Sequence, residues 1–146
     1  MSRTVMMSCT WIVVGLVATA VSRLSGSTYL GTFLETNLLV VLIALMAINT
    51  TTVSVILTKM LEIAEAHPEV DFASTRRNMR LSTVEQLVLV VIAAVLLTLK
   101  SSPWLVSHIP HFAFVGDSLL VAVFAYALQV LYDTASAVYV ILDHDQ

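Results

Sequence analysis

The sequence predicts an all-α integral membrane protein with four transmembrane helices and a helical cytoplasmic hairpin between the second and the third. Of its 146 residues, 58% are hydrophobic and only 12% are charged, whereas a soluble domain carries roughly 25% charged residues. The mean hydropathy is +0.92. Four apolar segments approach or reach the roughly 20 residues that an α-helix needs to cross a bilayer. We therefore expect a single membrane domain over residues 1–146.

The first expected span covers residues 5–21 and ends before Arg23. Arg3 and the motif Ala18-Thr19-Ala20 would also suit a cleaved signal peptide, but we favour a retained span. The second span covers residues 38–58, with Asn37 as its expected N-cap.

The third and fourth expected spans each begin beside a carboxylate. The third covers residues 84–99 and follows the helix-start pattern Ser82-Thr83-Val84-Glu85. The fourth covers residues 117–142. We interpret Glu85 and Asp117 as caps, because a negative charge is favourable at a helix N-terminus.

Basic residues near the span ends predict the orientation, since they are retained on the cytoplasmic side. One side of the four-span arrangement carries Arg3, Lys59, Arg76, Arg77 and Arg80, whereas the other side carries only Arg23 and Lys100. Both termini and the loop of residues 59–83 are therefore expected in the cytoplasm. Trp104 then falls at the outer interface, where its amphipathic ring suits the headgroup layer.

The cytoplasmic loop contains two blocks of opposite charge. The acidic block holds Glu62, Glu65, Glu69 and Asp71, and the basic block holds Arg76, Arg77 and Arg80. The second span is expected to continue as a helix and to stop before Pro68. Two interpretations remain open. The charges are solvated and meet lipid headgroups, or the acidic block, an exposed Phe72 and the arginines bind a soluble protein partner.

Polar residues inside two spans are the other candidate functional group. The second span contains Asn49, Thr50, Thr52 and Ser54, and the fourth carries the stripe Tyr126, Gln129, Asp133 and Ser136. A charge at the bilayer centre costs about 2.5 to 3.5 kcal/mol, so we expect Asp133 to face the bundle interior or a cavity. These residues either hold helices together by hydrogen bonds or line a polar cavity or oligomeric pore.

Composition and motifs exclude several function classes. Seven Lys and Arg stand against ten Asp and Glu, and without a basic block we expect no direct nucleic-acid binding. Cys9 is the only cysteine, which excludes an intrachain disulfide and a multi-cysteine metal site. His108 and His111 are too few for a closed zinc site. We expect no catalytic residues, no metal and no cofactor.

Three functions remain: an oligomeric subunit that anchors or signals to a cytoplasmic partner, a channel or membrane-perturbing effector, and a small transporter subunit. The first is preferred. The size, the four-span layout, the segment LLVVLIALMAINTTTVSVIL and the charged hairpin resemble the small membrane subunits of bacterial antiphage defence complexes of the KwaA type. This resemblance implies a tetrameric scaffold in the bacterial inner membrane that carries a cytoplasmic effector, and it transfers no functional residue.

Overall fold

The computed structural model describes the backbone of residues 3–66 and 72–143 and the side chains of residues 10–65 and 72–136. Within these ranges every regular element is an α-helix: α1 (Arg3–Leu24), α2 (Tyr29–Ala66), α3 (Ala73–Lys100), α4 (Pro103–His108) and α5 (Phe112–Asp143). Among the described residues, α2, α3 and α5 are long and apolar enough to cross a membrane. The expected all-helical architecture is therefore confirmed for the described residues, and three of the four expected spans correspond to helices that could cross a membrane. The apolar part of α1 with described side chains, Thr10–Leu24, is shorter.

The helix starts predicted for the last three spans are wrong. α2 begins at Tyr29, so Asn37 is not an N-cap, and its side-chain amide instead donates to the Phe33 carbonyl at 3.1 Å. α3 begins at Ala73, which places the pattern Ser82 to Glu85 inside the helix. Serine, threonine and asparagine resemble caps in sequence, but inside a helix they can bond to the carbonyl four residues earlier.

α5 is the central helix of the bundle, because α1, α2 and α3 all pack on it. In the most apolar part of α5, 39% of the residues are buried, against 17% in both α2 and α3. The main core joins α2, α3 and α5, and includes Leu34, Leu38, Leu42, Leu89, Ala93, Leu120, Ala127 and Val130. Many other large apolar side chains point outward, as expected of helices that face lipid.

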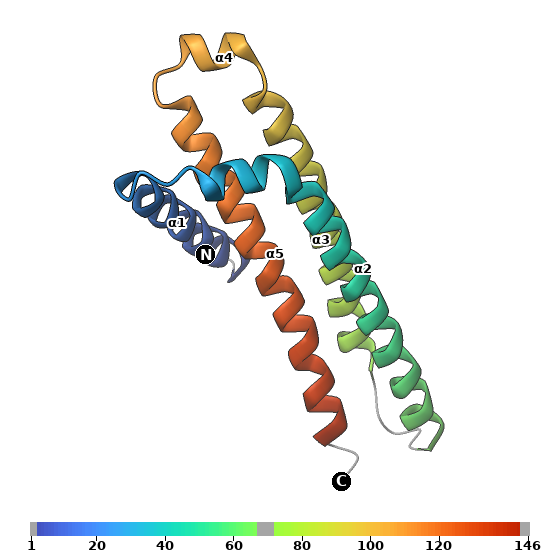
Figure 1. The fold of residues 1–146 in the computed structure, drawn as a ribbon. Coiled ribbons are helices and arrows are strands. Elements are labelled where there is room, and N and C mark those ends of the chain that lie inside the picture. The colour runs from blue at the N-terminus through green and yellow to red at the C-terminus, as the bar shows by residue number, and fades with distance from the viewer. Residues whose placement is uncertain (1–2, 67–71, 144–146) are drawn as a thin grey trace.

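α1 packs closely on the upper half of α5 (Figure 1). The contact depends on Gly15, since a Cβ atom there would lie 2.3 Å from the Ser118 carbonyl oxygen and 3.0 Å from the Ala122 Cβ. Such an approach of two backbones through small residues is typical of membrane helices. The lower half of α5 is not covered by α1 in this view.

A second, smaller core closes the lower ends of α2 and α3. It contains Ile56, Met60 and Met79, with Phe72 packed against them. The expectation that Phe72 is exposed is therefore wrong: it is partly buried, because an aromatic ring beside this apolar cluster is more stable packed than solvated. α2 continues to Ala66, which confirms that the second span extends as a helix beyond residue 58, whereas Pro68 lies outside the described residues.

Candidate functional sites

Two polar groups lie at different levels of the bundle. The charged layer consists of Arg23, Glu35, Lys100 and Asp117, and the polar cluster consists of Asn49, Ser82, Glu85, Gln86, Gln129, Asp133 and Thr134. Between their members on α2, α3 and α5, the two groups are about 18 to 27 Å apart along the helix axis. The apolar core lies between them. From Arg80 to Lys100, α3 rises about 30 Å, the thickness of a hydrocarbon core.

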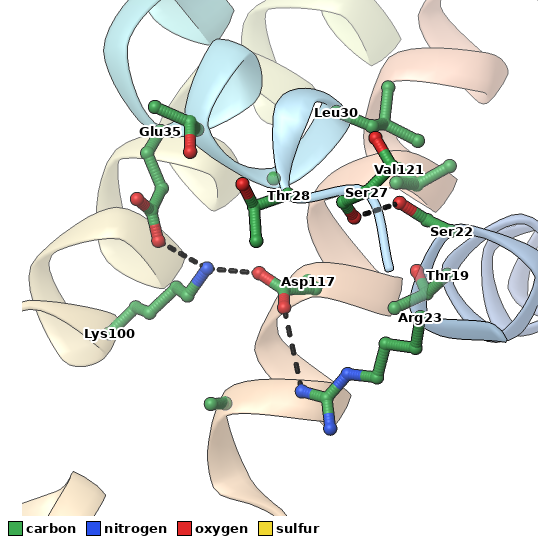
Figure 2. Close-up of a pocket in the computed structure, with 13 residues that line it drawn as sticks. Thr19, Ser22, Arg23, Ser27, Thr28, Leu30, Glu35, Lys100, Asp117 and Val121 are labelled. Carbon is green, nitrogen blue, oxygen red and sulfur yellow. Dashed lines mark hydrogen bonds and ion pairs between the residues drawn. The ribbon is translucent and has the colours of Figure 1, made fainter. Parts of the chain in front are cut away.

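The charged layer joins all four long helices. The Lys100 ammonium of α3 pairs with Glu35 of α2 and Asp117 of α5, and Asp117 also lies 3.7 Å from the Arg23 guanidinium of α1. The guanidinium in turn lies 4.9 Å from the centroid of the Phe114 ring. Negative and positive groups alternate, so that each inner charge has an oppositely charged neighbour on both sides (Figure 2).

Asp117 is therefore not a helix cap. α5 begins at Phe112, and the carboxylate of Asp117 faces Lys100 and Arg23. Glu85 is not a cap either, because it lies well inside α3, where it interacts with the Tyr126 hydroxyl of α5. Both carboxylates precede apolar runs, which resembles a helix start in sequence, but their partners come from other helices.

The turn between α1 and α2 brings several polar residues to the charged layer. Gly26 has a φ of +68°, a conformation that glycine adopts without a steric penalty. Its N–H donates to the Arg23 carbonyl at 3.0 Å, and the Ser27 N–H donates to the Ser22 carbonyl at 2.9 Å. This pair of bonds is the Schellman motif. It ends α1 and reverses the chain, which places Ser27 and Thr28 opposite Asp117 (Figure 2).

A cavity of about 390 Å³ adjoins the charged layer. Its wall includes all four charged residues and five hydroxyl-bearing residues, Thr19, Ser22, Ser27, Thr28 and Thr32. Thr19 is only 4% exposed, and its hydroxyl has no hydrogen-bond partner. This site is not predictable from the sequence, because Arg23, Lys100 and Asp117 appear there as isolated charges at the ends of apolar segments.

The polar cluster contains a chain of hydrogen bonds through three helices. The fully buried Asn49 of α2 donates to the Ser82 hydroxyl of α3 at 3.4 Å. The hydroxyls of Ser82 and Thr134 of α5 are 3.0 Å apart, and Thr134 donates to the Val130 carbonyl at 3.0 Å. Because a hydroxyl has one hydrogen, Ser82 must donate to Thr134. Thr134 was not among the residues predicted from the sequence, because its neighbour Asp133 is charged and Thr134 is not.

Some buried polar atoms of the cluster have no partner. Gln86 is 2% exposed, and neither atom of its amide makes a hydrogen bond. The oxygen of the Asn49 side-chain amide also has no hydrogen-bond partner. Leaving a buried polar group unsatisfied costs about 1 to 3 kcal/mol. The buried amides of Gln86 and Asn49 therefore lower the stability of the single chain unless they gain a partner.

Asp133 does not face the interior of the single chain. It is exposed on α5 and accepts a hydrogen bond of 2.6 Å from the Gln129 amide, one turn earlier. The expectation of an inward-facing Asp133 is therefore wrong for one copy, because the inward positions of this turn are occupied by Val130 and Thr134. Tyr126 and Ser136 are half-buried.

The hydroxyls of residues 50, 52 and 54 in the middle of α2 bond within their own helix. Thr50, Thr52 and Ser54 donate to the carbonyls of Met46, Ile48 and Thr50 at 2.8 to 3.0 Å. Each bond stays within α2, and Thr50 and Ser54 are exposed. Asn49 is thus the residue of this segment that connects α2 to its neighbours.

The charged ends of α2 and α3 are open to solvent. Glu62 and Glu65 are exposed on α2, and Lys59 lies 2.6 Å from the Glu62 carboxylate. Arg76, Arg77 and Arg80 are exposed on α3. Glu69 and Asp71, the remaining members of the acidic block, lie outside the described residues.

Within the part of the chain that the structure describes, no three His, Cys, Asp or Glu residues come together as a metal site. In comparisons with protein-family models, curated proteins and solved structures, none matches this chain.

Proposed function

We propose that the protein is a non-enzymatic membrane subunit that associates with copies of itself through α5 and holds a soluble partner at its cytoplasmic end. The observation that carries this proposal is the exposed Asp133, paired with the half-buried Gln129, within a helix long and apolar enough to cross a membrane. Asp133 adjoins Thr134, which contacts Ser82 two residues from Arg80, so its carboxylate lies near the cytoplasmic edge of the hydrocarbon core, where a polar partner is preferred to lipid. Contact with a second copy supplies that partner when the carboxylate gains a further donor.

The residues around this pair suit a contact between helices. Leu128 is 42% exposed and Tyr132 is 68% exposed, and with Gln129 and Asp133 they form what we call the α5 face. In a symmetric contact, Gln129 of one copy donates to Asp133 of another, and the reverse bond forms as well. Interhelical hydrogen bonds of this kind contribute about 0.6 kcal/mol each on average, and the leucine and tyrosine add packing.

The exposed charges at the ends of α2 and α3 support the second half of the proposal. Glu62 and Glu65 provide an acidic surface on one helix, and Arg76 and Arg77 provide a basic surface on the next. Complementary charges of this kind speed association and select partners. In the setting that the resemblance implies, the subunit would be a tetramer in a bacterial inner membrane, and its partner would be an effector of an antiphage defence complex.

Cysteine cross-linking tests the self-association. In a Cys9→Ser background, Tyr132→Cys should give covalent dimers after mild oxidation in membranes. Leu87→Cys is the matched control, since it is 53% exposed on α3 near the level of the polar cluster, and it should give few dimers. Equal cross-linking at both positions, or none at Tyr132→Cys, would remove the α5 face as the site of association.

Co-purification tests the partner. A Glu62→Lys, Glu65→Lys double variant should release a soluble protein that co-purifies with the wild-type chain from native membranes, because it reverses the acidic surface. Thr58→Lys adds a positive charge at an exposed position of the same helix end and should retain the protein. If the double variant still retains it, the acidic residues are not part of the binding surface.

A further inference from the structure

The wall of the cavity beside the charged layer carries two positive and two negative side chains. Arg23 and Lys100 are balanced by Glu35 and Asp117, and hydroxyls make up much of the remaining wall. A simple cation or anion in this cavity would be repelled by as many side chains as attract it. A ligand that carries both charges, each at its own end, matches this wall better.

One side of the cavity, next to the Asp117–Arg23 pair, offers donors to the negative end of such a ligand. Leu30 and Gly31 line it from the first turn of α2, where backbone N–H groups have no acceptor within the helix. The N-terminus of a helix also carries a partial positive charge and favours phosphate. Thr28 adds its hydroxyl at the same point. Thr19, whose buried hydroxyl lacks a partner, is part of the same wall (Figure 2).

The next turn of α2 suits a positive end. The Glu35 side chain is 47% exposed, and one of its oxygens pairs with Lys100. Its other oxygen is available to accept hydrogen bonds from an ammonium group. Figure 2 shows Thr28, Glu35 and Asp117 around the same space.

We propose that this cavity binds an amine-bearing phosphate ester, with the phosphate at the start of α2 and the amine at Glu35. A volume of about 390 Å³ corresponds to roughly a dozen water molecules at about 30 Å³ each, which is sufficient for a headgroup but not for an acyl chain. The cavity lies at the ends of the apolar parts of α3 and α5, where lipid headgroups are found. The ester can therefore belong to a phospholipid or to a soluble molecule.

Native mass spectrometry of the full-length protein tests the proposal. The protein is equilibrated with phosphatidylethanolamine, phosphatidylcholine and phosphatidylglycerol in turn. The ethanolamine lipid should be retained about tenfold more than the other two, because choline has no N–H donor and glycerol has no amine, and tenfold corresponds to about 1.4 kcal/mol. Soluble phosphoethanolamine, titrated into the detergent-solubilised protein, separates the two sources. Binding by the lipid alone assigns the site to a headgroup, and binding of the soluble ester assigns it to a free molecule.

Two variants place the binding in the cavity. Gly31→Leu inserts a side chain next to Asp117, where the nearest atom is 3.6 Å from the position of a Cβ, and should reduce the retention about tenfold with all charges intact. Thr36→Leu, an exposed position on the same helix, is the control and should have no effect. Glu35→Gln keeps the shape and should abolish the preference for ethanolamine over glycerol. Equal retention of the three lipids without binding of phosphoethanolamine, or unchanged retention in folded Gly31→Leu, would overturn the proposal.

Discussion

Lys100 lies between two carboxylates, Glu35 of α2 and Asp117 of α5, and its side chain is only 13% exposed. Lys59 makes a superficially similar pair with Glu62, but its side chain is 49% exposed and its partner is on the same helix. Exposed ion pairs contribute about 0 to 1 kcal/mol. Removing one partner from a buried pair is far more costly, because the remaining charge is left uncompensated.

Replacing each lysine with methionine separates the two cases. Lys100→Met leaves Glu35 without its ion-pair partner and Asp117 with only Arg23, and should lower the free energy of unfolding by about 2 kcal/mol. Lys59→Met should lower it by less than about 1 kcal/mol. Thermal unfolding in detergent, followed by circular dichroism, measures both. Equal losses would show that the charged layer does not hold the helices together.

Gly15 is the residue at which α1 and α5 come closest. Gly15→Ala places a methyl group 2.3 Å from the Ser118 carbonyl oxygen, and the two helix backbones must separate to accommodate it. We expect a loss of about 1 to 3 kcal/mol in the free energy of unfolding, as for other overpacked sites. Gly31→Ala is the control, because its Cβ would have ordinary contacts. An unchanged free energy of unfolding in Gly15→Ala would contradict the close packing of α1 on α5.

Among the elements, α5 connects the two candidate sites. Asp117 near its start belongs to the charged layer, and Gln129, Asp133 and Thr134 belong to the polar cluster. The face that carries Val130 and Thr134 is buried against α2 and α3, whereas Asp133 is on the exposed side of the same turn. α5 is therefore both the centre of a single copy and the surface through which copies are proposed to associate.

Asp133→Asn distinguishes a helix contact from an ion path. The amide retains an acceptor and removes the charge, so for a helix contact the stability in detergent should be unchanged or higher, and reconstituted bilayers should show no current. If Asp133 lines a water-filled path, the wild-type protein conducts cations and the variant conducts fewer. Planar-bilayer recordings of both proteins decide the question. A current that depends on Asp133 would replace the scaffold by a channel.

For the whole molecule, the charged layer and the exposed arginines of α3 lie at opposite ends of the bundle. The expected orientation places the arginines in the cytoplasm and the cavity at the outer interface. This assignment depends on the distribution of basic residues, five against two. The cavity would then face the outer leaflet, and the proposed partner-binding end would face the cytoplasm.

Cysteine labelling tests this orientation. Ser74, at the start of α3, and Ser107, in α4, are both exposed, so single cysteines there in a Cys9→Ser background should be reactive. A membrane-impermeant maleimide should label Ser107→Cys in intact cells and Ser74→Cys only after permeabilisation. Labelling of both from outside would exclude the proposed topology, and the opposite pattern would reverse it.

The sequence alone predicted the all-helical membrane architecture, because the bilayer requires long apolar segments and these are visible in the composition. It also located the polar residues of α2 and α5. It placed the helix starts incorrectly, since hydroxyl and amide side chains that resemble caps were in fact bonded within longer helices. Local patterns cannot distinguish these two uses of the same residue.

Only the tertiary structure identified the partners of the polar residues. The four residues of the charged layer come from four different helices: Arg23, Glu35, Lys100 and Asp117. They meet because the turn at Gly26 and the packing of Gly15 on α5 bring α1 and α2 over the ends of α3 and α5. The rotation of α5 likewise decided that Thr134 is buried and Asp133 exposed. Hydrophobic periodicity predicts such a rotation weakly in a membrane helix, because lipid and protein interior are both apolar and both faces of the helix carry similar residues.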